Sequence, residues 1–295
     1  MKKDFIKILV SSGILFSFAV NSASAAEVDT YTPPLNEPVN TERLKEAEQI
    51  VNGASDESDE KKFNFSIEGR YFAPHMDIKV HSDKIKYRDG SVGLKDDLGF
   101  GNDKAPEVIL RYKRFSMDYI HVHGAGDREF TKSNPLLFGG VNLRGNVHSQ
   151  SDFHYLKLQI TNPINEHYGS GFDWSYGLTG IYWRGTAEGT AVSSNKSVDG
   201  RTEKKSEKVG APVPTLGIGG HAKLYDNITA YAHISGLPMG GYGHFYDFEA
   251  GVRFNPTDRF GIDIGYRKIH ANINHKNDHG KFNLQGYFAG IRYDF

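Results

Sequence analysis

Apolar and polar residues alternate with a period of two along most of the chain from Phe63 onward. For example, Phe172 and Trp174 alternate with Asp173 and Ser175. This period is typical of a β-strand, because successive side chains point to opposite faces of the sheet. The alternating runs are about 8 to 12 residues long, which is enough to cross a bilayer at a tilt. They predict ten strands, at about 62–73, 106–113, 115–123, 148–161, 171–186, 211–224, 228–236, 244–255, 259–270 and 281–295.

The polar face of these strands and the lengths of the connections favour a membrane barrel over a soluble sandwich, which also alternates. The polar face combines charge with glycine, as a narrow barrel interior requires, since it must be polar and still small enough to close. Short connections alternate with long ones, the pattern of periplasmic turns and outer loops. The short ones are 113–114, 162–169, 225–227 and 255–258, and the long ones are about 74–105, 124–147, 187–210, 237–243 and 271–280. The sequence therefore predicts an all-β protein, a transmembrane antiparallel up-and-down β-barrel of about ten strands, with eight to twelve as the range.

The first 26 residues predict a secretory signal peptide. Lys2 and Lys3 begin a positive segment, residues 8–20 are apolar, and small residues allow cleavage after Ala25 or Ala26. An N-terminal membrane anchor is the alternative. The short apolar stretch and the small residues that follow it favour a cleaved peptide and export from the cytoplasm.

Residues 27–61 predict a periplasmic arm that precedes the barrel domain, residues 62–295. Prolines keep the start of the arm extended, and apolar residues at helical spacing predict a short helix over 40–52. The charged segment 54–62 follows. A tail with one marginal helix is favoured over a helix that docks on a partner or on the barrel mouth, because isolated helices of this length are weak in water.

The composition excludes several classes of function but does not identify the function. The chain has 35 Lys+Arg and 36 Asp+Glu, so there is no electrostatic case for binding nucleic acid. The absence of Cys excludes a disulfide scaffold, a thiolate zinc site and a cysteine nucleophile. Aromatic residues make up 13% of the chain, and many lie near the proposed periplasmic turns, as expected for an interface girdle. These are Tyr112, Phe115, Tyr168, Phe172, Tyr225, Phe254, Phe260, Tyr293 and Phe295.

The C-terminal strand contains the most specific motif. Phe295 ends the chain, Tyr293 precedes it by two residues and Gly290 by five. This pattern resembles the assembly signal of outer-membrane barrels, which the insertion machinery of diderm bacteria reads. Phe288 departs from it, because a polar residue is usual at that position. A terminal strand without a tail can pair with the first strand and leave no free edge.

The order of features resembles a family of small Gram-negative outer-membrane β-barrel proteins of uncharacterised function. The similarity lies in the loop segment Val92-Gly-Leu-Lys-Asp-Asp-Leu-Gly99, the hairpin 107–122 and the region 138–149, and it excludes the arm. It implies a protein of the cell outer membrane whose partners are the outer-membrane lipid bilayer and the barrel-assembly machinery. The family brings no catalytic residues and no cofactor.

Charged residues on the polar face are expected to line a hydrated lumen. They are Glu68, Arg70, Arg111, Lys157, Asp173, Glu249, Arg253, Asp263, Arg267, Arg292 and Asp294. They could line a small ion-selective pore, or pair into a network that fills the lumen. The network is favoured, because the interior of about ten strands is narrow and the signs are nearly balanced.

Three other groups of polar residues suggest chemistry. Oxygen ligands for Ca²⁺ cluster in the first loop, although a solvated loop is the favoured interpretation; they are Asp96, Asp97, Asn102 and Asp103. Imidazoles could bind Zn²⁺ or Cu²⁺ at His121 with His123, or at His270, His275 and His279. Interface and loop positions are the simpler explanation, and we predict no metal site.

An enzyme at the outer rim of the barrel would need a histidine beside a serine or carboxylate. The candidate pairs are His154 with Asp152, His233 with Ser235, and His244 with Asp247. None has a recognisable nucleophile motif. We therefore predict a structural or surface-interaction protein with a narrow, charge-filled lumen. A small porin for ions or small solutes and a rim enzyme acting on lipid or peptide are the alternatives.

Overall fold

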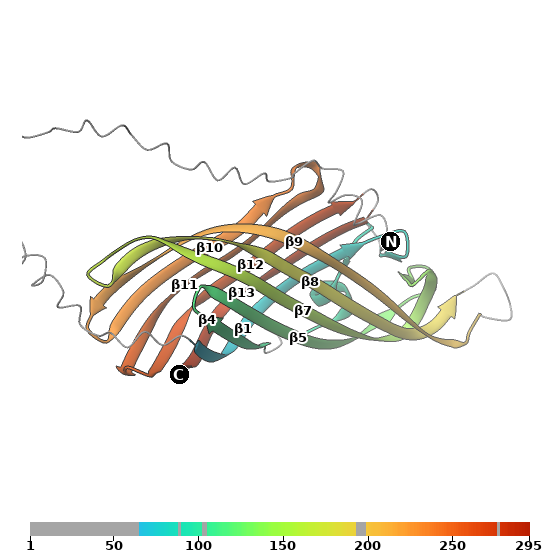
Figure 1. Ribbon diagram of the computed structural model, residues 1–295. Helices are drawn as coiled ribbons and strands as arrows, with labels where there is room; N and C mark the ends of the chain where they lie inside the picture. The colour runs from blue at the N-terminus through green and yellow to red at the C-terminus, as the bar shows by residue number, and fades with distance from the viewer. Residues whose placement is uncertain (1–64, 88–89, 102–104, 193–198, 276–277) are drawn as a thin grey trace, which may run out of the picture. The chain divides into compact units, whose positions relative to one another are not determined.

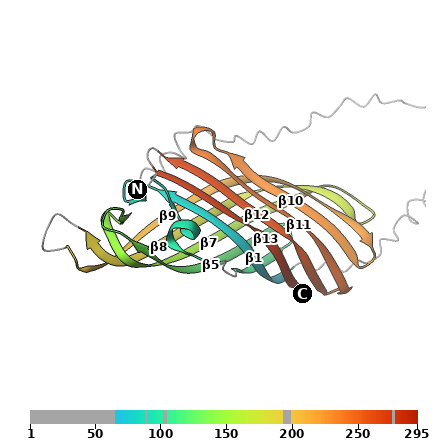
Figure 2. The ribbon, with the colours of Figure 1, turned by 180° about the vertical axis from the view of Figure 1, so that it is seen from behind.

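Ten long strands close into a barrel in the computed structural model, which describes residues 65–87, 90–101, 105–192, 199–275 and 278–295. They are β1 (Phe65–His81), β4 (Ala105–Tyr112), β5 (Phe115–Phe130), β7 (Val141–His167), β8 (Ser170–Val192), β9 (Thr202–Tyr225), β10 (Ile228–Pro238), β11 (Gly243–Thr257), β12 (Phe260–His275) and β13 (Asp278–Asp294). Each strand is antiparallel to its neighbours, and β1 pairs with both β4 and β13, which closes the ring. Figures 1 and 2 show this ring from opposite sides. The predicted fold class is confirmed; the predicted signal peptide and arm lie outside the described residues.

The strands are longer at one end of the barrel than the sequence predicts. Tight turns such as Tyr168–Gly169 join strands at one end, here called the turn end. At the opposite, loop end, β7, β8 and β9 have 27, 23 and 24 residues, so most of the predicted loops 124–147 and 187–210 are strand. The sequence analysis missed these extensions because their outward side chains are polar. Apolar outward residues therefore no longer mark the alternation there.

The long connection after β1 folds back into the loop end of the barrel. Within it, β3 (Val92–Gly93) pairs with β1, β2 (Ile85–Lys86) pairs with β6 (Leu136–Phe138), and α3 (Leu94–Leu98) follows β3. Leu94 and Leu98 are buried, and a Cβ at Gly126 of β5 would collide with the Leu98 carbonyl oxygen. Glycine is therefore required on the inner wall where the α3 segment packs. A second short helix, η1 (Gly240–Tyr242), joins β10 to β11. Among the described residues, no helix is long and apolar enough to span a bilayer.

The outer wall is apolar between two aromatic rows. Most of the aromatic residues predicted near the turn end are exposed there, and a second row of tyrosines lies nearer the loop end. Along β11 the apolar stretch runs from Phe254 to Tyr246, about 27 Å of strand at a rise of about 3.4 Å per residue. A tilt of about 40° makes this about 20 Å of height, close to the apolar band of a transmembrane barrel. The second row consists of Tyr71, Tyr119, Tyr182, Tyr246, Tyr266 and Tyr287.

The interior has two layers of different chemistry. Nearer the turn end it is charged, and nearer the loop end it is a packed apolar core. That core, here called the apolar layer, includes Phe72, Met76, Ile78, Leu94, Leu98, Ile120, Phe153, Phe245, Phe282 and Leu284. The expectation of a hydrated interior throughout is thus wrong for the loop-end half. There the wall rises above the outer tyrosine row and encloses the folded-back loop, whose buried surface must be apolar to be stable.

Candidate functional site

The charged layer near the turn end is assembled by strand register. Antiparallel pairing places opposite charges directly across from each other on the inner face, which favours the pairing. The five such pairs are Arg70 with Glu107, Glu68 with Arg292, Asp118 with Lys157, Glu249 with Arg267, and Arg253 with Asp263. The contributing strands β1, β4, β5, β7, β11, β12 and β13 present these side chains through their period of two, so the layer follows from the alternation in the sequence.

Arg267 is the centre of one half of the layer. Its side chain is 1% exposed, and its Nη2 lies 2.7 Å from Asp118 Oδ2 and 2.8 Å from Asp247 Oδ2. Its Nη1 also contacts Glu107. Asp247 accepts further hydrogen bonds from the Tyr155 hydroxyl at 2.7 Å and from Lys157 Nζ at 3.1 Å. One guanidinium thus holds three carboxylates from three different strands.

Glu68 and Arg70 organise the other half. Arg70 Nε contacts Glu68, and Arg111 Nη1 donates to Glu68 Oε2 at 2.6 Å. Arg70 Nη1 lies 2.9 Å from Glu249 Oε1. Arg253 Nε is 3.0 Å from both carboxylate oxygens of Asp263. Every cation of this half has at least one carboxylate partner.

Contacts between strands that are not neighbours join the two halves across the interior. Arg267 of β12 contacts Glu107 of β4, Tyr155 of β7 donates to Asp247 of β11, and Arg70 of β1 contacts Glu249 of β11. Such contacts are possible only if the side chains meet inside the ring. Together these ion pairs and hydrogen bonds form a continuous plate across the barrel.

Phe288, which departs from the usual assembly motif, packs against Arg70 of this plate. Its ring centroid is 4.3 Å from the Arg70 guanidinium carbon, a cation–π contact. Gly265, its partner in register on β12, leaves the space that the ring occupies, since a Cβ there would collide with it. The apolar residue at this position is therefore accommodated by the charged layer.

Three of the predicted lumen residues, Arg292, Asp294 and Asp173, lie at the edge of the layer. Arg292 pairs with Asp294 at 2.6 Å, on the same strand near the turn end. Asp173 is half-buried on the same face of β8 as Ser175, whose hydroxyl is 3.1 Å from His233 Nε2. His233 also lies 3.2 Å from Gln159 Nε2. Ser175, Gln159 and His233 thus form a polar cluster beside the ionic plate.

The sequence analysis missed three carboxylates of the layer: Glu107, Asp118 and Asp247. The alternation within each strand already indicated them, because Glu107 shares a face with Arg111, and Asp247 shares one with Glu249. With these three added, the predicted lumen residues comprise eight acidic and six basic side chains. The layer is more acidic than the sequence predicted.

The candidate enzyme pairs do not form as proposed. His244 points outward and Asp247 inward, so that pair is wrong: residues three apart on a strand lie on opposite faces. Asp152 forms its hydrogen bond with His123, at 2.8 Å, while His154 is bonded to the Tyr119 hydroxyl. The Ser235 hydroxyl has no hydrogen-bond partner among the described residues.

Of the candidate metal ligands, His121 and His123 both lie against Asp152, at 3.6 and 2.8 Å. Among the described residues, no group of three or more His, Asp or Glu side chains is arranged to hold a metal ion. Asp97 accepts a hydrogen bond from the Gly93 backbone N–H at 2.7 Å, and Asp96 lies in the same short helix. His270 stacks on His244, whereas His279 bonds to Asn274. Asn102, Asp103 and the His275 side chain lie outside the described residues.

The fold and the interior together define a class. The protein is a closed ten-stranded transmembrane β-barrel whose interior is filled by an ionic plate and an apolar core. No protein-family model and no curated protein sequence matches the chain.

Several solved structures have a similar arrangement of strands. The outer-membrane protease OmpT of Escherichia coli aligns with 80% of this chain and 100% of its own, at 10% identity and a TM-score of 0.46. Neisserial surface protein A aligns with 79% of this chain and 97% of its own, at 11% identity and a TM-score of 0.32. Ail, the attachment invasion locus protein of Yersinia pestis, aligns with 78% of this chain and 97% of its own, at 15% identity and a TM-score of 0.32. These likenesses assign no activity to this chain.

Proposed function

We propose that this protein is an outer-membrane β-barrel with a structural or surface-interaction role and an interior closed to ions and solutes. The observation that carries the proposal is the pair of layers inside the barrel. An ion that entered from the turn end would meet a plate whose cations and carboxylates are already paired, with Arg70 and Arg267 at its centre. Beyond the plate it would meet the apolar layer, where an ion loses its hydration without compensation.

A small porin is therefore the weaker alternative. A conducting pore needs charged groups that remain hydrated and available to a passing ion. In the plate, the side chains of Glu68, Arg70 and Glu107 are fully buried. The α3 segment adds buried leucines to the apolar layer at the loop end.

The length of the strands supports a role at the surface. A transmembrane strand needs about 9 to 11 residues, so β7, β8 and β9 project well beyond the outer tyrosine row. Figure 1 shows the ends of β8 and β9 extending past the neighbouring strands at the loop end. The projecting hairpin has its own buried face, including Ala187 and Ala191, and an exposed charged face that includes Glu188 and Lys204. This construction suits a rigid surface on which another molecule can dock.

Export and assembly complete the proposal. The signal peptide would direct secretion, and the C-terminal strand would be read by the barrel-assembly machinery. The Phe295 backbone N–H donates to the Phe65 carbonyl oxygen at 2.9 Å, and the two rings lie 5.3 Å apart. The last residue of the assembly signal thus helps to join the terminal strands.

Conductance in planar bilayers tests the closed interior. The full mature chain, folded and reconstituted, should give no single-channel steps above the lipid background. The double variant Phe153→Ala/Phe282→Ala, which removes two contacting rings of the apolar layer, tests whether that layer matters to closure. It should admit more current than the parent chain, and stable steps from the parent chain would overturn the proposal in favour of the porin.

A further inference from the structure

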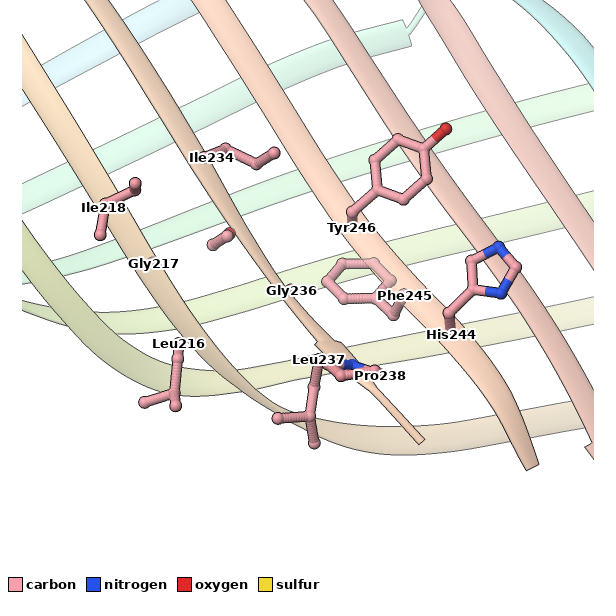
Figure 3. Close-up of a pocket in the computed structure, with 11 residues that line it drawn as sticks. Leu216, Gly217, Ile218, Ile234, Gly236, Leu237, Pro238, His244, Phe245 and Tyr246 are labelled. Atoms are coloured by element: carbon pink, nitrogen blue, oxygen red, sulfur yellow. The ribbon is translucent and has the colours of Figure 1, made fainter. Parts of the chain in front are cut away.

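A hollow on the outer wall of the barrel lies next to a group of basic residues. The hollow has a volume of about 370 Å³ and lies over β9, β10 and β11 (Figure 3). Its outward side chains include Leu216, Ile218 and Ile234, which are all exposed. Volumes of about 300 to 1,000 Å³ are usual for small-molecule sites.

Strand register explains the hollow. Gly236 of β10 is paired with Leu216 of β9 on one side and with Tyr246 of β11 on the other. Its position faces outward, so the row Leu216–Gly236–Tyr246 lacks a side chain at its middle. A Cβ at Gly236 would collide with the Phe245 carbonyl oxygen, so the hollow is built into the backbone. Figure 3 shows Gly236 between its two neighbouring strands.

The outward row Leu216–Gly236–Tyr246 continues across β11 and β12 to three basic residues. Tyr246 is paired with His270, whose ring lies 5.0 Å from the tyrosine ring and 5.1 Å from that of His244. Lys268 Nζ lies 5.9 Å from the Tyr246 ring centroid. Asn283 and Lys281 lie beside this group on β13, where they are paired with His270 and Asn272. We call Lys268, His270 and His244 the basic group. Lys268 supplies the cation, and the two imidazoles supply ring N–H donors.

Lys268, the cation of the basic group, has no outward carboxylate beside it to balance its charge. The outward positions of β10, β11, β12 and β13 in the described strands contain no Asp or Glu. The nearest outward acid is Asp77 of β1, which pairs with Lys281 at 3.7 Å. The opposite wall differs, because there Asp152 already contacts His121 and His123. The surface beside the hollow therefore attracts an anion, whereas the opposite wall already has its own carboxylate.

We propose that this hollow binds a membrane lipid with a phosphate headgroup. An acyl chain would lie in the hollow between Leu216 and Ile234, and the phosphate would contact the basic group just beyond the apolar belt. The order along the strand fits a lipid, because the apolar residues Ile262 and Ile264 precede Tyr266, Lys268 and His270. The inference rests on the membrane location proposed above, but not on the closed interior.

Native mass spectrometry of the full mature chain in a neutral detergent tests the site. The probes are dimyristoyl phosphatidate, dimyristoylglycerol with the same chains, and inorganic phosphate. Lys268→Gln combined with His270→Gln should weaken phosphatidate binding roughly tenfold, as expected for the loss of one charge contact and one hydrogen bond at a partly dehydrated surface. It should leave dimyristoylglycerol binding unchanged. Leu216→Trp, which fills the hollow from the paired strand, should weaken binding of both lipids.

The matched control is His123→Gln with His154→Gln, which removes two outward imidazoles from the opposite wall. The control should bind phosphatidate like the parent chain, and gel migration before and after boiling checks that each variant is folded. Unchanged phosphatidate binding in both test variants, or an equal loss in the control, would overturn the proposal. Equal affinity for inorganic phosphate would also overturn it, because the acyl chain would then contribute nothing. Liposome flotation tests the membrane location separately, so the two failures are distinguishable.

Discussion

Replacement of Arg267 by methionine should be among the most destabilising single changes in the barrel. Methionine keeps much of the side-chain volume but removes the cation that contacts Glu107, Asp118 and Asp247. The Arg267 side chain is 1% exposed, so solvent cannot take its place. Removing one partner of a buried ion pair costs about 3 to 5 kcal/mol, because the other charge stays buried and unpaired. Lys157 and Tyr155 still contact Asp247, so the loss of the cation mainly destabilises the buried Glu107 and Asp118 side chains.

The free energy of unfolding can be measured by urea titration of the protein in lipid vesicles, followed by gel migration without boiling. Arg111→Met is the matched control, because Arg111 is 30% exposed and contacts one carboxylate that keeps Arg70 as a partner. It should cost about 1 kcal/mol or less. Adding Glu107→Gln to Arg267→Met should recover part of the loss, with a coupling of about 1 to 3 kcal/mol. Equal losses for Arg267→Met and Arg111→Met, with no recovery, would refute this account of the charged layer.

Three further predictions concern orientation, the loop segment and assembly. The chain has no Cys, so Glu188→Cys should react with a membrane-impermeant maleimide on intact cells, whereas Asp226→Cys should react only after the outer membrane is permeabilised; the reverse pattern would invert the proposed orientation. Gly126→Ala should displace the backbone at Leu98 and make the loop after β1 several-fold more sensitive to limited proteolysis, and unchanged cleavage would argue against the packing described. Deletion of Phe295 should lower the amount of folded protein in the outer membrane several-fold at equal synthesis, and an undiminished amount would remove its role in assembly.

The chemistry inside the barrel was only partly accessible from sequence. The alternation placed Glu249, Arg253 and Arg267 on one face, because parity along a strand is a local property. The partners of Arg267 come from β4, β5 and β11, and nothing local indicates that Glu107 and Asp118 would meet it. Register and barrel closure set those distances, and both depend on the whole ring.

The sequence by itself determined the strand periodicity, the approximate number of strands and the positions of the short turns at the turn end. These follow from side chains that must alternate between an apolar outside and a tighter inside. Only the tertiary structure decided that the first long loop turns inward with Leu94 and Leu98 buried, and that the loop-end half of the interior is apolar. The physical reason is that an inward-facing Phe72 or Phe153 is as apolar as a lipid-facing residue, and composition alone cannot tell which surface will cover it.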